Sequence, residues 1–195
     1  MSTTPRPPEF DFPLSWSGPD GIGASPFDEF TEAEGPDVDG DDPALALRKT
    51  LGMFATGVTV ITTLKGEQVH GMTANAFMSV SLEPPLVLIS VDRRTKMCGM
   101  LHEGSHYGVS VLCETQSSLS DRFAGRPCDD CPAPRFDLVR QTPLVEGALA
   151  RFVARVERSY WGGDHSLFLG RVEYARQGPG APLLFHGGRY ERLGA

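Results

Sequence analysis

The chain has 195 residues, of which 40% are hydrophobic, and its formal net charge is −7 at pH 7. This length suits one domain of ordinary size, and the negative charge argues against nucleic acid or an anionic membrane as the main partner. No apolar run approaches the ~20 residues of a membrane span, and residues 1–13 lack the basic-then-apolar order of a signal peptide. We therefore expect a soluble, cytoplasmic protein.

Residues 1–42 differ in composition from the rest of the chain. They hold 11 of the 25 acidic residues and one of the 18 basic residues, Arg6, so they carry −10 while residues 43–195 carry +3. The segment is rich in Pro and Gly and has no period of 2 or 3.6, which is typical of a disordered or loosely docked tail. Two readings stay open: a solubilising extension, or a regulatory or partner-binding arm on the basic body.

The body begins with a predicted helix. Asp41 or Asp42 can cap its first turn, and Pro43 suits a first position that needs no amide donor. Leu47, Leu51 and Phe54 form one apolar stripe, and Gly57 is expected to end the helix.

Short strands dominate the remainder. We expect them at residues 58–64, 69–72, 76–81, 86–91, 106–112, 148–160 and 166–174, with a terminal hairpin of 183–185 and 189–193. Residues 58–64 are β-branched, and residues 86–91 are almost continuously apolar, which indicates cover on both faces. Residues 148–160 alternate as a half-buried strand does, although Leu149, Val153 and Val156 also fit a helical stripe.

Two short helices interrupt the strands. Thr95 can cap one that runs to Leu101, and Thr115 can cap another that ends at Gly125. The total is about seven or eight short strands with two or three short helices, which points to an antiparallel barrel with helices packed at its ends.

Nucleotide motifs of the common kinds are missing from the sequence. No G-x-G-x-x-G follows a predicted strand, and no G-x-x-x-x-G-K-[ST] occurs. A Rossmann or P-loop site is therefore not expected, and a nucleotide would have to be held in another way.

The four cysteines do not suggest a metal site. Cys128 and Cys131 form a C-x-x-C pair, but Cys98 and Cys113 supply no second pair for zinc. The two aspartates between the paired thiols disfavour the thiolate that a thioredoxin-type nucleophile needs. We expect incidental thiols or a local disulfide, and a redox switch is the alternative.

Three polar segments could carry chemistry. Asp164 and His165 follow two glycines in a predicted turn, where the carboxylate can orient the imidazole; an ordinary turn with an exposed His is the alternative. Residues 92–95 (Asp-Arg-Arg-Thr) join a strand to a helix and suit a phosphate, or are a solvated basic turn. Residues 73–75 (Thr-Ala-Asn) could admit a flat ligand to the backbone, or are ordinary turn residues.

Taken in chain order, these segments and their neighbours carry a family resemblance. They read Phe54-Ala-Thr-Gly-Val-Thr-Val-Ile-Thr-Thr63, Gly71-Met-Thr-Ala-Asn75, Ser79-Val-Ser-Leu-Glu-Pro-Pro-Leu-Val87, Phe123-Ala-Gly125, Gly163-Asp-His165 and Gly188-Arg-Tyr190. The series resembles the flavin reductase-like family, the short-chain NAD(P)H:flavin oxidoreductases that serve two-component monooxygenases, over residues 44–194.

The resemblance implies a mainly β fold: an antiparallel split β-barrel with a few short flanking helices over residues 43–195. It also implies a homodimer with flavin at the interface. The implied activity is hydride transfer from NADH or NADPH to FMN or FAD, with a flavin-dependent monooxygenase receiving the reduced flavin. The alternative is a split barrel that binds flavin or haem without turnover.

The resemblance also implies roles for individual residues. Residues 73–75 would line the isoalloxazine, residues 90–95 would follow the ribityl chain and phosphate, and residues 123–125 would close the site. His165 would lie near the nicotinamide with Asp164 orienting it, and these two are the candidate catalytic pair. The implied cofactor-binding residues are Thr73, Ala74, Asn75, Ala76, Ser90, Val91, Asp92, Arg93, Arg94, Thr95, Phe123, Ala124, Gly125, His165, Phe185 and Tyr190.

The implied chemistry needs little from the side chains themselves. Hydride transfer depends on stacked rings more than on an acid or a base, so no nucleophile and no essential general base is expected. The sequence departs from many relatives at Ala76, where they have Ser, and in the cysteine-containing loop and the acidic tail.

Overall fold

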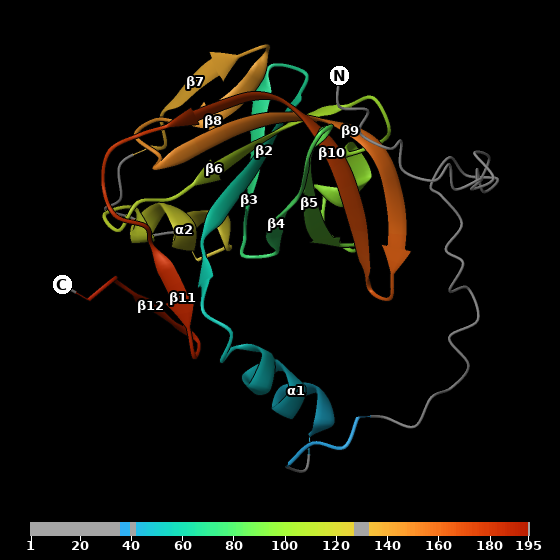
Figure 1. The fold of residues 1–195 in the computed structure, drawn as a ribbon, viewed down its shortest axis with the longest axis vertical. Helices are drawn as coiled ribbons and strands as arrows, with labels where there is room; N and C mark the ends of the chain where they lie inside the picture. The colour runs from blue at the N-terminus through green and yellow to red at the C-terminus, as the bar shows by residue number, and fades with distance from the viewer. Residues whose placement is uncertain (1–35, 40–41, 127–132, 195) are drawn as a thin grey trace, which may run out of the picture.

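One curled antiparallel sheet carries most of the chain (Figure 1). The computed structural model describes residues 36–39, 42–126 and 133–194. The seven strands of this sheet lie in the order β3-β2-β6-β9-β10-β5-β4. They are β2 (Thr59–Lys65), β3 (Gln68–Ala74), β4 (Phe77–Leu82), β5 (Pro85–Asp92), β6 (His106–Val111), β9 (Ala150–Gly162) and β10 (His165–Gln177).

The two edge strands of the sheet are consecutive in the sequence. Only Asn75 and Ala76 separate the end of β3 from the start of β4. Three Cα–Cα steps span at most about 11 Å, so the two edges must approach each other and the sheet must curl. No ladder of hydrogen bonds joins β3 to β4 in the described residues. The predicted antiparallel split barrel is therefore confirmed, open between these two strands.

Smaller elements pack around the barrel. β1 (Thr56–Gly57) pairs with the hairpin of β11 (Leu184–His186) and β12 (Arg189–Glu191), and β7 (Phe136–Val139) pairs with β8 (Thr142–Val145). The helix α2 (Ser117–Phe123) follows β6, and a single 3₁₀ turn covers Cys98–Met100.

β2 separates two hydrophobic cores because both of its faces are covered. Residues 59–63 are all buried, with Ile61 in the core enclosed by the barrel and Val60 in the second core. The first core includes Ile89, Tyr107 and Phe168. The second core lies under α2 and the terminal hairpin, where Phe123, Phe185 and Tyr190 pack against its margin.

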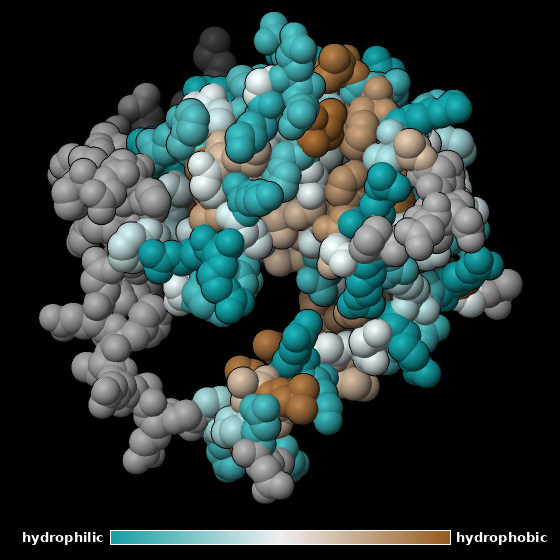
Figure 2. All heavy atoms as spheres, turned by 180° about the vertical axis from the view of Figure 1, so that it is seen from behind, coloured by the Kyte–Doolittle hydropathy of each residue, from teal (hydrophilic) through white to brown (hydrophobic). Residues whose placement is uncertain are grey.

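The N-terminal helix α1 (Pro43–Leu51) stands away from the barrel (Figure 1). Its start is as predicted: Leu45 N donates to Asp42 Oδ1 at 3.1 Å, and Pro43 occupies the first position. None of its residues is buried. Seen from behind, apolar atoms gather around this helix (Figure 2), so it has an apolar surface that its own chain leaves uncovered.

Most predicted elements are confirmed, and several boundaries were wrong. α1 ends at Leu51 and Gly52 rather than at Gly57. Residues 71–74 belong to β3 rather than to a connection, because β3 pairs with β2 along its whole length. The expected helix from Thr95 is reduced to the 3₁₀ turn, and α2 begins after Gln116 rather than Thr115.

Other differences concern the burial of β5 and the number of strands. The alternate residues Val87, Ile89 and Val91 of β5 are buried while its other face is half-buried, so residues 86–91 are not enclosed on both sides. Residues 148–160 resolve as strand, not helix. The hairpin of β7 and β8 was not predicted, and the structure has twelve strands in its described part.

Cys128, Cys131 and nearly all of the acidic segment lie outside the described residues, so the predictions for them stay as they were. Neither α1 nor α2, the helices within the described ranges, has the length and apolar content that a membrane crossing requires. No cluster of three or more His, Cys, Asp or Glu side chains suited to a metal ion occurs in that same part of the chain.

Gly170 allows β10 to lie close to the fully buried Tyr107. A Cβ at position 170 would collide with the Tyr107 hydroxyl and would lie 2.9 Å from its Cε1. We expect Gly170→Ala to lower the free energy of unfolding by about 1–3 kcal/mol, the usual range for overpacking a core. Urea unfolding followed by circular dichroism measures this.

The matched control is Gly99→Ala, where a Cβ would meet no atom within 4 Å. The Tyr107 hydroxyl is buried without a hydrogen-bond partner among the described residues. Tyr107→Phe should therefore restore part of the loss. Equal midpoints for the two glycine variants would contradict the expected collision.

Candidate functional site

The crossing between the two sheet edges forms an exposed rim. Asn75 and Ala76 are both exposed, and Ala76 O accepts a hydrogen bond from Ser90 N at 3.1 Å. Thr73 Oγ1 donates to Ser120 O at 2.6 Å, which ties the end of β3 to α2. Asn75 and Ala76 thus stand exposed at this crossing, with Ser90 beside Ala76.

The segment after β5 is organised by Asp92. Its carboxylate accepts from Arg94 Nη2 at 2.6 Å and from Arg94 N at 2.8 Å, and these hydrogen bonds hold the pKa of Asp92 well below its ordinary value. Thr95 Oγ1 donates to Asp92 O at 2.7 Å and accepts from Cys98 N at 3.2 Å. Residues 92–98 therefore form a turn closed by its own side chains.

The two arginines of this turn have different partners. The charge of Arg94 is balanced by Asp92, although its side chain is 84% exposed. Arg93 has no carboxylate within ion-pair distance in the described ranges, and its guanidinium carbon lies 4.5 Å from the centroid of a Trp161 ring. Of the two arginines, Arg93 is therefore the one whose charge no described carboxylate balances.

The turn between β9 and β10 places Asp164 and His165 beside the turn that follows β5. Gly163 adopts a φ of 66°, which a residue with a side chain rarely does. His165 pairs with Asp92 across the sheet, and Arg93 N donates to Asp164 O at 3.0 Å. The turn of residues 162–165 therefore lies directly against the turn of residues 92–95.

Asp164 orients the imidazole, as predicted from the sequence. Asp164 Oδ1 lies 2.7 Å from His165 Nδ1, and this hydrogen bond lowers the pKa of Asp164. An ionised carboxylate can only accept, so Nδ1 carries the proton. The Nε2 edge of His165 is left for another partner, and the side chain is 40% exposed.

A second group of predicted residues gathers around α2. Tyr190 Oη donates to Asp121 Oδ1 at 2.9 Å and lies 2.8 Å from Ser120 Oγ, and burial raises the pKa of Tyr190. The rings of Tyr190 and Phe185 pack edge to face at 5.8 Å. These contacts dock the terminal hairpin on α2, where the Ser120 carbonyl oxygen accepts from Thr73 Oγ1.

The structure therefore sorts the predicted residues into two groups. The hairpin group consists of Asp92, Arg93, Arg94, Thr95, Asp164 and His165. The helix group consists of Thr73, Phe123, Phe185 and Tyr190, with Ala124 and Gly125 exposed at the end of α2. Residues 74–76 and Ser90 lie in the chain between the groups. The Val91 side chain is fully buried in the first core, so its backbone alone is available.

Two residues of this region were missed by the sequence reasoning. Trp161 carries the contact to Arg93, and its place beside the Gly162–Gly163 break was a usable signal. Ser120 joins Thr73 to Tyr190, and nothing in the sequence distinguishes it from the other serines of α2. Cys98 and Cys113 are both free thiols.

The residues that the structure describes leave Asn75 and Ala76 of the rim exposed. Two hollows of about 410 and 560 Å³ lie elsewhere, and no predicted site residue lines either of them. The first is lined in part by Lys65, His70 and Lys96. The open rim thus offers backbone groups, cations and an oriented imidazole, all on one accessible surface.

Comparison with known proteins places this arrangement in context. Residues 51–194 match the family model described as "Flavin reductase like domain". The chain is 45% identical over 166 residues to the NADH-dependent flavin reductase of a Rhodococcus species, which covers 84% of this chain and 93% of that protein.

Two further relatives are similar over most of their length. The reductase component of 4-hydroxyphenylacetate 3-monooxygenase from Thermus thermophilus is 41% identical over 149 residues, or 76% of this chain and 95% of that protein. The solved structure of flavin reductase PheA2 in its native state has a TM-score of 0.73 at 41% identity and covers 79% of this chain and 99% of that one.

Proposed function

This chain belongs to the flavin reductase-like family, and we propose from that membership that it is an NADH-dependent flavin reductase serving a flavin-dependent monooxygenase. The observation that carries the proposal is the match of residues 51–194 to the family model. Relatives named as an NADH-dependent flavin reductase and as a monooxygenase reductase component support the dinucleotide and the partner. FMN or FAD is the acceptor.

The residues of the rim suit a flavin. A flat ring system needs close approach to backbone groups and few bulky side chains, and Asn75 and Ala76 have short side chains on an exposed surface. A phosphate needs cations and hydroxyl or amide donors. The turn of residues 92–95 supplies the guanidinium groups of Arg93 and Arg94 at the end of β5, beyond Ser90 along the same strand. Thr95 closes this turn through its hydrogen bond to Asp92 O. These residues are proposed to hold the ribityl phosphate portion.

The hairpin group suits the nicotinamide side of the reaction. A bound flavin accepts the hydride of NADH, so the protein has to bring the two rings together rather than supply an acid or base. His165 is fixed at Nδ1 by Asp164, and its side chain is partly exposed. We assign His165 to binding and orienting the nicotinamide and Asp164 to fixing the imidazole.

Anaerobic reduction of excess flavin tests the activity directly. The purified protein should bleach the absorbance of FMN or FAD catalytically when NADH is added, and NADPH serves as the comparison donor. Flavin that binds but is reduced by neither dinucleotide would contradict the proposal. It would leave a flavin- or haem-binding split barrel as the function.

His165→Ala should raise the KM for NADH with a smaller effect on flavin affinity. A single hydrogen bond and the ring packing are lost, so a rise of about 5- to 30-fold is expected from roughly 1–2 kcal/mol. Steady-state kinetics with varied NADH give KM, and a flavin titration gives the second affinity. His102→Ala is the matched control, because His102 lies outside the site. Equal losses of both affinities would make His165 a structural residue.

The exposed apolar residues support a homodimer. They cluster in and after α1 (Leu45, Leu47, Leu51, Met53 and Phe54) and on the edge strand β4 (Met78, Val80 and Leu82). Phe54 is 78% exposed and Leu82 is 90% exposed, which is costly for large side chains in water. A nine-residue helix is also marginal without packing. A second copy of the chain would cover both surfaces and supply the missing wall beside the rim.

Leu82→Asp, alone or with Phe54→Asp, should dissociate the dimer, because a charge would be buried at the interface. Size-exclusion chromatography with light scattering should give twice the monomer mass for the parent and the monomer mass for the double variant. Leu138→Asp, on β7 and also exposed, is the control that should remain dimeric. A monomeric parent at micromolar concentration would contradict this assignment.

A further inference from the structure

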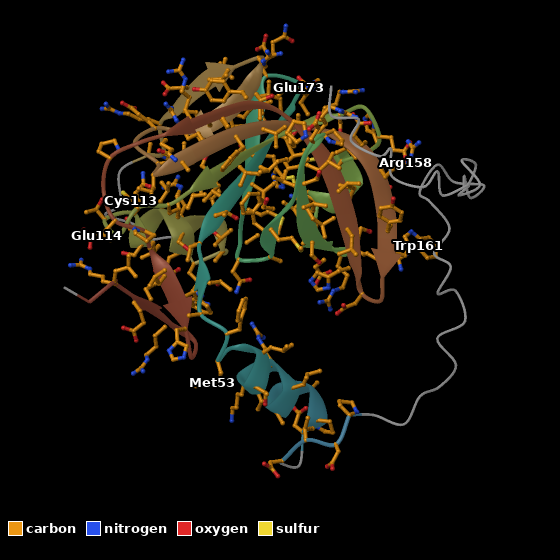
Figure 3. All side chains as sticks on the ribbon, in the orientation of Figure 1. Met53, Cys113, Glu114, Arg158, Trp161 and Glu173 are labelled. Atoms are coloured by element: carbon orange, nitrogen blue, oxygen red, sulfur yellow. The ribbon has the colours of Figure 1, made fainter. Side chains whose placement is uncertain are left out.

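Trp161 contacts the site from β9, a strand that carries no residue with an assigned role in the proposed reaction. It lies on β9 near the turn that leads to β10, three residues after Arg158 (Figure 3). In the sheet it pairs with Ser166, and its ring lies against the Arg93 guanidinium at 4.5 Å. The contact therefore joins the strand before the β9–β10 turn to the turn after β5.

The contact uses the face of the indole ring. Trp161 Nε1 is buried and has no hydrogen-bond partner within the described part of the chain. Buried N–H groups without an acceptor are rare because they are costly. An aromatic residue without this group, such as Phe, would avoid that cost. Trp161 therefore makes its polar interaction through the face of its ring, which contacts the Arg93 guanidinium. The distance is that of a cation–π contact.

The β9–β10 turn is closed by the pairing of His165 with Gly162, and its tip makes few contacts with other segments. Gly162 and Gly163 are exposed and have no side chains, and Asp164 is 79% exposed. The link to the neighbouring segment is the hydrogen bond from Arg93 N to Asp164 O at 3.0 Å, together with the pairing of His165 with Asp92. Arg93 therefore binds the turn through its backbone while Trp161 binds Arg93 through its side chain.

Arg94 cannot replace Arg93 in this arrangement. Its guanidinium is engaged by Asp92 through two of its nitrogens, Nε at 3.1 Å and Nη2 at 2.6 Å. Arg93 lacks such a carboxylate among the described residues. An arginine without a partner would sample several rotamers, and the contact with the indole face favours the one that the structure shows.

We propose that Trp161 is a positioning residue that fixes Arg93 and, through it, the turn that carries Asp164 and His165 toward the nicotinamide. This rests on the proposed function, in which His165 meets NADH. Trp161 does not touch the reacting atoms in this assignment. It reduces the freedom of the turn before the dinucleotide binds, so its loss weakens NADH binding and leaves the transfer itself intact.

The test compares Trp161→Leu with Trp161→Phe in the full chain. Trp161→Leu should raise the Kd for NAD⁺, measured by isothermal titration calorimetry, and the KM for NADH by roughly fivefold, the factor that an ordinary cation–π contact supplies. The kcat at saturating NADH should stay within about twofold of the parent. So should the Kd for riboflavin, which lacks the phosphate assigned to Arg93. Trp161→Phe keeps a π face and should restore most of the affinity.

Two controls separate positioning from general damage. Tyr160→Leu removes the neighbouring, 40% exposed aromatic side chain of β9 and should leave NAD⁺ affinity unchanged. A double-mutant cycle of Trp161→Leu with Arg93→Gln should be non-additive, because the two changes remove one contact, whereas Trp161→Leu with Arg158→Gln should be additive.

The outcomes distinguish this inference from the proposed function. A parent that neither binds NAD⁺ nor reduces flavin would overturn both. An active parent with unchanged Trp161→Leu constants, parallel losses of riboflavin and NAD⁺ affinity, or a Trp161→Phe variant as weak as Trp161→Leu would overturn the role of Trp161 alone. Urea unfolding confirms that each variant is folded under assay conditions.

Discussion

The architecture depends on the two residues that carry the chain from one edge of the large sheet to the other. Asn75 and Ala76 leave no room for a long connection, so β3 and β4 must meet at one end and the sheet must curl around the first core. The same two residues form the exposed rim, held to Ser90 by a backbone hydrogen bond. The constraint that curls the sheet therefore also creates the surface on which a flat ligand can lie.

The rim and the hairpin group illustrate how separate parts of the chain are brought together. Sheet pairing places His165 opposite Asp92, although 72 residues of chain separate them. Local hydrogen bonds then complete the geometry: Asp92 with Arg94, and Asp164 with His165. Each carboxylate has a lowered pKa for that reason, so both stay ionised beside the cations of the site. The electrostatics of the site thus follow from strand register.

The sequence predicted the strands and the family well, because alternation, glycines and turn residues are local signals. It did not separate Arg93 from Arg94, since the difference lies in which partner each side chain meets: Trp161 for one and Asp92 for the other. The hairpin of β7 and β8 was missed because its turn residues, Arg140 and Gln141, both adopt positive φ without being glycine or asparagine. Ser120 was missed because its importance comes entirely from tertiary contacts.

The position of β2 between two cores has a consequence for how the molecule opens. Because Val60 and Ile61 serve opposite cores, the terminal hairpin and α2 can separate from β2 without exposing the interior of the barrel. Amide protons of β11, β12 and α2 should exchange with solvent through a local opening of lower free energy than those of β6, β9 and β10. The region around Tyr190 is then a separate cooperative unit, able to breathe while the strands that hold His165 and Asp92 remain paired.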